Sequence, residues 1–538
     1  MLLGVLAVVF GPLAVASVST GSWGIPHNDD WDFIRSALLL HSTGTVQFSG
    51  WGQMTLVGQL ALVQPLLAAH AGPGALDAFG LAATVVYVTA SYGVARPLLG
   101  HRIGLLAAAT VAVSPVLAIC STTFMTDVPA AALEMSALYL GCRAIGEGAF
   151  SRRFFTAAVV ASEIAACIRE TQAVVIVAIA ATAILVTRNR ADGSRRFVAV
   201  TSFVALALFA AVLLWRHEQP GATSFHYLSA ATFFTDWLRL SSAAALFLIP
   251  VLVFVPWRSV IRNAPRLTWL AVAAAAILGA YQAANGSLLP GNLILPSGPT
   301  GDAVLAGVRP TLLPQSIWMG LNYAAAASLA GLLILLCYGL RVLLRGAGKK
   351  LLPRGPSPAA LVIAVLAGMT LVTSASFYSS TAPFDRYTLP LVPLLAICVG
   401  LTSRYVLRRE GGKRYVTRGR VLAAGLAGVG LLSLGLEMAV SNDAYDAARW
   451  RAGLLLSQSL NANRIDAGFE WSGFHARLPL QRGAPTTDPA FYAVQFGIEP
   501  CLLVTNSAGN GAKPVGKWTD ATGGTNALFV LRLAAPGC

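Results

Sequence analysis

The chain has 538 residues, of which 56% are hydrophobic and 11% are charged, and its formal net charge is +15. A soluble domain is about a quarter charged and could not bury this much apolar surface in one core, while a disordered chain would not be rich in aliphatic residues. Seven cysteines in such a length exclude a disulfide scaffold. The composition therefore predicts an all-α, polytopic membrane protein.

Thirteen apolar segments could cross the hydrocarbon core as helices, each of which needs about 20 residues. These segments lie at 2–20, 76–94, 103–120, 125–142, 154–167, 171–187, 197–215, 241–257, 267–284, 316–340, 359–376, 388–403 and 421–440. A further apolar segment at 54–71 is interrupted by polar residues and by Pro65, so we expect an interfacial or re-entrant helix there. The first segment has no basic residue before it, as a signal peptide would have, and is predicted to be an uncleaved span.

The basic residues follow the pattern expected of a chain whose N-terminus is cytoplasmic. The predicted inner loops contain 24 of the 38 Lys and Arg residues, and the outer loops and helix ends before residue 441 contain six. The positive charge therefore indicates orientation and contact with anionic membrane lipid rather than a nucleic-acid partner. The usage of 33 Arg against five Lys is typical of a GC-rich bacterial genome, so the predicted location is a bacterial cytoplasmic (inner) membrane.

Polar residues and turn signals return after residue 440. Residues 1–440 are predicted to form the membrane domain, with a first outer loop at 21–75, and residues 441–538 a small extracytoplasmic α/β domain. Helical spacing at 443–460 and strand patterns at 464–471, 501–505 and 527–533 support this domain.

Five side chains of this C-terminal region have two possible roles each. Cys501 and Cys538, the only cysteines there, either pair in an oxidising compartment or stay as free thiols. Trp471, Phe474 and Tyr492 either stack on a sugar or pack in the core of the domain.

The first candidate site lies in the first outer loop, where Asp29, Asp30 and Asp32 fall within four consecutive positions. Adjacent carboxylates repel each other, which raises at least one pKa and suits a general base. The alternative is a solvated cluster in which Asn28 or Asp29 caps an amphipathic helix over 31–41.

The second candidate site begins at Asp127, at the predicted outer mouth of a span. Glu134 follows seven residues later, nearly two helical turns, and therefore faces the same side about 10 Å deeper. Acids inside a membrane are costly and mark functional sites. Glu163 and Glu170 repeat the spacing, and Arg169 could instead form a structural ion pair with Glu163 or Asp127.

The third candidate site is Arg386, followed by Tyr387, at the lip of a late span. Arg386 is the only basic residue of the segment 377–387. A guanidinium at this depth could hold a phosphate, or it could be an interfacial anchor that extends toward the headgroups.

Taken in this order, the three sites resemble the GT-C superfamily of integral-membrane glycosyltransferases, in particular the protein O-mannosyltransferases and the lipid A aminoarabinose transferases. The matching motifs are the acidic pair Asp29-Asp30, the segment Thr126-Asp127-Val128-Pro129, and Arg386-Tyr387-Thr388-Leu389-Pro390. The superfamily's His-Pro-Pro-Leu motif is missing, with Trp51-Gly-Gln-Met54 in about its place, and the second acid of the pair is Asp instead of Glu. These departures leave the donor sugar and the acceptor open.

The resemblance implies an inverting transfer of a sugar from a polyprenyl-phosphate donor to a lipid, glycan or protein acceptor on the non-cytoplasmic side. It assigns the role of general base to Asp29 first and to Asp30 second, and it makes Asp127 a further catalytic residue. It also assigns the binding of the carrier phosphate to Arg386. The other expected substrate-binding residues are Tyr387, Arg169, Glu134, His27 and Asp32, while His41 is more simply an interfacial histidine. No cofactor or metal is expected, although three clustered aspartates could bind Mg²⁺ or Mn²⁺.

Two other classes of membrane protein compete with this interpretation. A transporter or flippase of lipid-linked sugars would need charged residues along a path to both faces, whereas the membrane acids gather near the outer side. An oligosaccharide polymerase or ligase tends to use an Arg-rich outer loop, and this chain has few outer basic residues.

Overall fold

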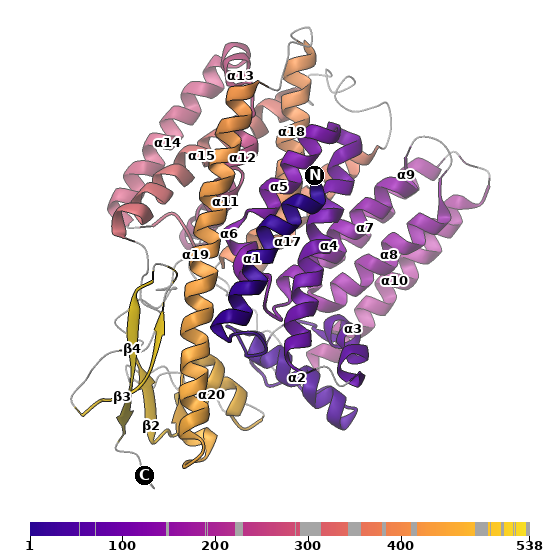
Figure 1. Ribbon diagram of the computed structural model, residues 1–538. Helices are drawn as coiled ribbons and strands as arrows, with labels where there is room; N and C mark the ends of the chain where they lie inside the picture. The colour runs from indigo at the N-terminus through magenta and orange to yellow at the C-terminus, as the bar shows by residue number, and fades with distance from the viewer. Residues whose placement is uncertain are drawn as a thin grey trace.

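The computed structural model describes the chain except for residues 53, 70–71, 147–149, 189, 191, 221–229, 286, 291–313, 343–356, 379–383, 410–416, 479–492, 495, 507–510, 520, 522 and 534–537. Helices make up most of the described chain, and a small sheet lies near its C-terminus (Figure 1). The predicted fold class, a polytopic helical protein with a small C-terminal α/β part, is therefore confirmed.

A helix coincides with each of the thirteen predicted segments because apolar residues fill every one of them. The helices of the first half are α1 (Leu2–Thr20), α4 (Gly74–Leu99), α5 (His101–Ala112), α6 (Pro115–Cys120), α7 (Asp127–Ala144), α8 (Arg152–Ile168), α9 (Ala173–Thr187) and α10 (Ser194–His217). Those of the second half are α11 (Ala230–Phe247), α12 (Ile249–Leu252), α13 (Trp257–Asn263), α14 (Pro265–Asn285), α15 (Gln315–Val342), α17 (Pro358–Tyr378), α18 (Leu391–Arg409) and α19 (Arg418–Leu456).

Eight helices among the described residues are long and apolar enough to cross a membrane, or nine if the bent pair α13 and α14 is one span. The chain is thus a multi-pass membrane protein, and the number thirteen stays a prediction. The segment predicted at 103–120 is broken into α5 and α6 at Ser114, whose extended backbone is the conformation favoured before a proline.

Two short helices follow α1, at the lower end of the bundle in Figure 1. They are α2 (Asp30–Thr43) and α3 (Val57–Ala68). With 12 residues, α3 is too short to cross a hydrocarbon core of about 30 Å, which agrees with an interfacial or re-entrant helix at 54–71.

The helix α19 is 39 residues long and carries the chain out of the bundle without a break. Residues 443–456, predicted as a separate helical stretch, are its last turns, so the predicted domain boundary at residue 441 falls inside a helix. We call residues 441–538 the C-terminal unit; it lies at the same end of the bundle as α2 and α3 (Figure 1).

The C-terminal unit contains a four-stranded sheet in the order β1-β2-β4-β3. Its strands are β1 (Ile465–Asp466), β2 (Leu502–Thr505), β3 (Lys513–Thr519) and β4 (Thr525–Arg532). β1 is parallel to β2, and the other neighbours are antiparallel. A disulfide joins Cys501 and Cys538, so these cysteines are paired rather than free.

The strand predicted over 464–471 is mostly wrong. Only Ile465 and Asp466 are extended, and after Gly468, whose φ of 104° favours glycine, the chain forms the helix α20 (Phe469–His475). α20 docks directly on α2: Arg35 donates a 3.2 Å hydrogen bond to the carbonyl of Gly473, and a Cβ at Gly473 would come within 2.4 Å of Trp31. A residue without a side chain is therefore required at this contact.

Candidate functional site

The residues between α1 and α2 form a tight turn that places three acidic side chains. α1 ends at Gly21, in the left-handed conformation, and Asn28 has a positive φ of 54°, which asparagine tolerates better than most residues. The Asn28 side chain accepts a 2.8 Å hydrogen bond from the amide of Asp29. The first residue of the acidic pair is thus oriented by its predecessor.

Asp29 occupies the position before the first residue of α2, yet its carboxylate does not cap the helix. One oxygen accepts a 2.9 Å hydrogen bond from Nε1 of Trp51, and the other accepts a 2.6 Å hydrogen bond from Nη2 of Arg386. The capping alternative is therefore wrong for this side chain, which is turned toward the third predicted site.

Arg386 is buried in a 3₁₀ turn, η4 (Asp385–Thr388), just before α18. Its Nε lies 3.7 Å from the second oxygen of Asp127, and its guanidinium lies 4.6 Å from the centre of the Phe384 ring. With a side-chain exposure of 4%, Arg386 is not a lipid-facing anchor. It bridges the first and second predicted acidic sites instead.

Arg169 completes this arrangement from the end of α8. It forms an ion pair with the first oxygen of Asp127 and lies 5.2 Å from the ring centre of Tyr387. Five of the predicted site residues therefore share one place, and we call Asp29, Asp127, Arg169, Arg386 and Tyr387 the Asp–Arg cluster. The structural ion pair considered for Arg169 does form, with Asp127 as its partner.

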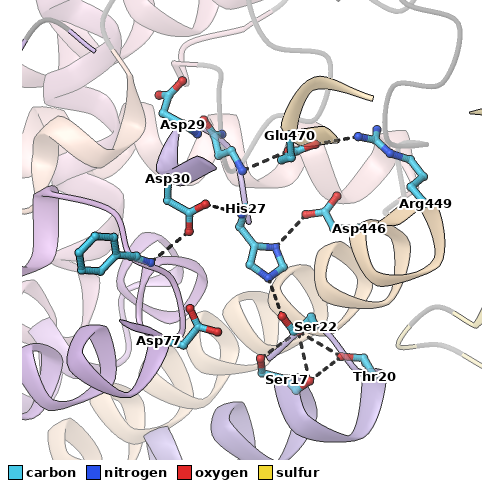
Figure 2. A network of polar contacts seen from close by, with 12 residues as sticks. Ser17, Thr20, Ser22, His27, Asp29, Asp30, Asp77, Asp446, Arg449 and Glu470 are labelled. Carbon is cyan, nitrogen blue, oxygen red and sulfur yellow. Dashed lines mark hydrogen bonds and ion pairs between the residues drawn. The ribbon is translucent and has the colours of Figure 1, made fainter. Parts of the chain in front are cut away.

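Asp30 has a different environment from its neighbour. Figure 2 shows that the carboxylates of Asp29 and Asp30 point away from each other. Asp30 is fully buried and accepts hydrogen bonds from the amides of His27 and Phe124. Burial, together with the nearby Asp77, raises its pKa well above the usual value. The expected pKa rise within the acidic cluster is thus present, but at Asp30 it arises from burial and Asp77 and not from repulsion by Asp29. Burial also raises the pKa of Asp32, and the charge of Asp29 adds to that rise.

His27 is also buried and joins the loop to α19. Its Nδ1 lies 3.0 Å from Asp446 and its Nε2 lies 3.3 Å from the carbonyl of Ser22 (Figure 2). Burial alone would lower the pKa of His27, but the hydrogen bond to Asp446 and the charges of Asp443, Asp446 and Asp30 outweigh it and raise the pKa to about 10. A protonated His27 is therefore a structural cation of this loop.

The remaining predicted residues lie outside the Asp–Arg cluster. Asp32 is buried and accepts a 2.9 Å hydrogen bond from the amide of Gly52. Glu134 is fully buried in α7, beside Gln172. His41 is exposed near the end of α2. Asp32 thus has a structural role, because its hydrogen bond fixes the loop that carries Trp51.

The aromatic residues proposed for sugar stacking have no common role. Trp471 is 1% exposed, and its ring packs 4.1 Å from His475 and 5.1 Å from Trp450, so it belongs to the core of the C-terminal unit. Phe474 packs 5.7 Å from Trp450. Tyr492 lies outside the described residues.

Two residues near the cluster had no predicted role. Trp51 belongs to the segment that stands where the superfamily's His-Pro-Pro-Leu motif was expected, and it contacts Asp29 directly. Arg216, at the end of α10, donates hydrogen bonds of 2.7 and 3.0 Å to the carbonyls of Gly52 and Met54. The available signal was that Arg216 is one of only six basic residues in the predicted outer loops and helix ends before residue 441.

The acidic residues do not form a metal centre within the described part of the chain. No group of three or more His, Cys, Asp and Glu side chains there could hold a metal ion. The paired arginine and aspartate side chains of the Asp–Arg cluster instead form a site in which a positive group sits between two negative ones.

Comparison with known proteins gives one match by sequence and several by fold. Residues 75–215 match the family of dolichyl-phosphate-mannose-protein mannosyltransferases. The whole chain is similar to the structure of ArnT from Cupriavidus metallidurans bound to undecaprenyl phosphate, with 13% identity, 97% of both chains covered and a TM-score of 0.40.

Two archaeal structures resemble this chain with about the same identity and TM-score. The oligosaccharyltransferase of Archaeoglobus fulgidus in complex with Zn and sulfate has 12% identity and a TM-score of 0.45, and the match covers 92% of this chain and 68% of that one. The same organism's AglB in complex with an inhibitory peptide and a dolichol-phosphate has 13% identity and a TM-score of 0.42, with 91% and 64% covered. No curated protein matches the chain.

The sequence match confirms the predicted resemblance to GT-C glycosyltransferases over the matched residues. It extends from α4 to α10 and includes Asp127 and Arg169 of the Asp–Arg cluster. Asp29 and Arg386 lie on either side of the matched segment, and their contact with Asp127 is a finding of the structure.

Proposed function

We propose that this protein is a glycosyltransferase that moves a sugar from a polyprenyl-phosphate carrier to an acceptor on the non-cytoplasmic side of a bacterial inner membrane, with inversion at the anomeric carbon. The general base is Asp29, and Arg386 binds the phosphate of the carrier. The acceptor is a lipid, a glycan or a protein.

The contact of Arg386 with both Asp29 and Asp127 carries this proposal. A buried guanidinium costs free energy unless it is paired, and here two acids from different segments pair with it at 2.6 and 3.7 Å. A positive group next to a candidate base is the arrangement that a transfer from a phosphate carrier needs. The base takes a proton while the cation stabilises the departing phosphate.

The proposed reaction is one displacement. The acceptor oxygen or nitrogen attacks the anomeric carbon and forms the new glycosidic bond, and its proton passes to the carboxylate of Asp29. The bond between the anomeric carbon and the phosphate oxygen breaks, and its electron pair leaves with polyprenyl phosphate. Arg386 holds that phosphate, while Asp127, itself paired with Arg169, keeps Arg386 in place.

The position of the Asp–Arg cluster in the fold supports a reaction on the non-cytoplasmic side of the membrane. The turn that carries Asp29 contacts the C-terminal unit, and Arg386 contacts Asp29. The helix α2, which follows this turn, lies at one end of the bundle, while α18 ends and α19 begins at the opposite end (Figure 1). The residues around that junction, 404–420, are the predicted inner loop richest in basic residues, with seven Lys and Arg. By the positive-inside rule, this arrangement supports a position of the Asp–Arg cluster on the outer face.

The test measures release of polyprenyl phosphate from a panel of polyprenyl-phosphate-linked sugars in vesicles that contain the purified protein, with lipid, glycan and peptide acceptors. We compare Asp29→Asn and Arg386→Ala with the matched controls Asp192→Asn and Arg532→Ala, whose side chains are exposed. The first pair should lose about a hundredfold or more of the activity, and the controls should retain it.

Two results would contradict the proposal. Full activity of an Asp29→Asn protein that inserts normally would remove Asp29 as the base. Movement of a labelled donor across the vesicle membrane without release of polyprenyl phosphate would favour a flippase.

A further inference from the structure

Two contacts join the C-terminal unit to the residues directly before Asp29. Nδ1 of His27 lies 3.0 Å from Oδ2 of Asp446, and the amide of Asn28 donates a 3.1 Å hydrogen bond to Oε1 of Glu470 (Figure 2). Asp446 belongs to α19 and Glu470 to α20. Two helices of one unit thus hold two successive residues of the loop.

The second contact is itself fixed within the C-terminal unit. Nη2 of Arg449 donates a 2.7 Å hydrogen bond to Oε2 of Glu470, so the two carboxylate oxygens of Glu470 have separate partners. Arg449 follows Asp446 by three residues, which places both on one face of α19. The carbonyl of Ala467 accepts a further 3.1 Å hydrogen bond from Arg449 and holds it against the start of α20.

These contacts are protected from water. His27, Asp446, Arg449 and Glu470 are all less than 10% exposed. Charged hydrogen bonds of this kind are stronger than those on a surface, and removal of one partner leaves the other buried and unsatisfied. The contacts of His27 and Asn28 with the C-terminal unit therefore hold this loop in one position.

The backbone of the loop depends on this support. Asn28 has a positive φ, a conformation that costs free energy for a residue with a side chain and persists only where the surroundings enforce it. The backbone amide of Asn28 donates a hydrogen bond to Glu470. Its side-chain oxygen accepts a hydrogen bond from the amide of Asp29 and lies 3.5 Å from Nη1 of Arg386. A change in the Asn28 turn would therefore shift Asp29 relative to Arg386.

We propose that the C-terminal unit acts as a positioning element for the Asp29 carboxylate, with Glu470 and Asp446 as positioning residues that hold the 27–28 turn in place. This inference rests on the proposed function for the role of Asp29, but the structural part of it can be tested separately. The unit then affects the rate of transfer through the position of the Asp29 carboxylate.

The test uses the full-length protein in lipid nanodiscs and compares hydrogen exchange in wild type, Glu470→Ala and a matched control, Asp466→Asn. Asp466 is a buried carboxylate of the same unit whose hydrogen-bond partners, Gly468, Ser472 and Ala493, all lie within the unit. Glu470→Ala should increase the exchange rate of peptides over residues 24–33 by about ten- to a hundredfold. Asp466→Asn should leave those peptides unchanged, even where it increases exchange around its own partners at Gly468, Ser472 and Ala493.

Transfer kinetics give the functional half of the test. Glu470→Ala should lower kcat about tenfold or more, because small displacements of a catalytic group are costly, while KM for the polyprenyl-phosphate donor changes little. Asp446→Ala should act in the same direction. A purely structural role of the unit would instead reduce the amount of folded protein and leave the kcat of the folded fraction intact.

The outcomes separate this inference from the proposed function. Unchanged exchange over 24–33 in Glu470→Ala would overturn the positioning role, whether or not the protein is a transferase. Increased exchange with an unchanged kcat would also overturn it. If the wild type releases no polyprenyl phosphate from any donor while exchange responds as expected, the proposed function fails. The structural part of the inference, that the C-terminal unit holds the 27–28 turn in place, is then still supported.

Discussion

Arg386 donates a 2.6 Å hydrogen bond to Asp29, although 357 positions separate them in the chain. The contact joins the turn that follows the first helix to the turn that precedes α18. Because both residues are mostly buried, their pairing depends on the packing of distant helices and not on local sequence. Four predictions follow from the environment of this pair and of the loop beside it.

Arg386→Lys tests whether the geometry of the guanidinium matters or only its charge. Arg386 contacts Asp29 through Nη2 and lies near Asp127 through Nε, and a single ammonium group cannot reproduce this two-sided arrangement. We expect Arg386→Lys to retain some activity above Arg386→Ala but to raise KM for the donor about tenfold. Equal kinetics for Arg386→Lys and wild type would show that charge alone is sufficient.

Trp51→Phe removes one hydrogen-bond donor from Asp29 and keeps an aromatic ring. Nε1 of Trp51 lies 2.9 Å from Oδ1 of Asp29, so its loss should lower kcat by about three- to tenfold, which corresponds to one hydrogen bond. Trp518→Phe is the matched control, because Nε1 of Trp518 is buried and has no hydrogen-bond partner among the described residues. A steady-state comparison in vesicles measures the effect, and equal losses in both variants would argue against an orienting role for Trp51.

Arg216→Met tests the support of the loop that carries Trp51. Arg216 donates to the carbonyls of Gly52 and Met54, and its removal leaves these groups without their charged partner at a cost of about 1–3 kcal/mol. We expect faster proteolysis between residues 44 and 56 and a lower thermal midpoint. Arg196→Met, at the exposed start of the same helix, should change neither measurement.

The raised pKa of His27 predicts a pH dependence of stability. His27 faces Asp443 and Asp446 from α19, Asp30 from α2 and Asp77 from α4, and its pKa is about 10 in the folded protein against 6.5 as a reference. The folded state binds the proton more tightly, so the stabilisation is complete below pH 6.5 and is lost as the pH rises toward 10.

The measurement compares thermal midpoints of wild type and His27→Gln at pH 6 and pH 10. The difference between the two proteins should be largest at pH 6 and shrink at pH 10, since the titration of Lys and Tyr residues elsewhere affects both alike. A difference that is the same at both pH values would show that the charge of His27 does not stabilise the fold.

The positions of the helices could be predicted because an apolar segment of about 20 residues is a local property of the sequence. What could not be predicted was where they break, as at Ser114, or that α19 continues past residue 440. In the C-terminal unit, β3 was missed because it contains Pro514 and Gly516 and is mostly exposed, and such residues weaken a strand pattern.

Four members of the Asp–Arg cluster could be predicted because Asp29, Asp127, Arg386 and Tyr387 stand in motifs with a known order along the chain. Arg169 stands in no such motif and was expected only as a substrate-binding residue or as an ion-pair partner of Glu163 or Asp127. The partners of the loop were not predicted, since Asp446, Arg449 and Glu470 meet His27 and Asn28 only through docking of the C-terminal unit. The spacing of Asp443, Asp446 and Arg449 along one helix face is typical of a solvated face, so the sequence gives no sign that the loop covers it.

Because α19 is one unbroken helix, the direction in which its last turns face is fixed by the direction in which its apolar part faces. A helix of 39 residues is about 58 Å long and turns by about 100° per residue. One residue inserted between the apolar part of α19 and Asp443 would therefore rotate Asp446 and Glu470 away from His27 and Asn28 while the membrane part kept its place. An insertion after Leu456, where the helix has ended, would leave that face aligned, so the chain tolerates length changes there and not before.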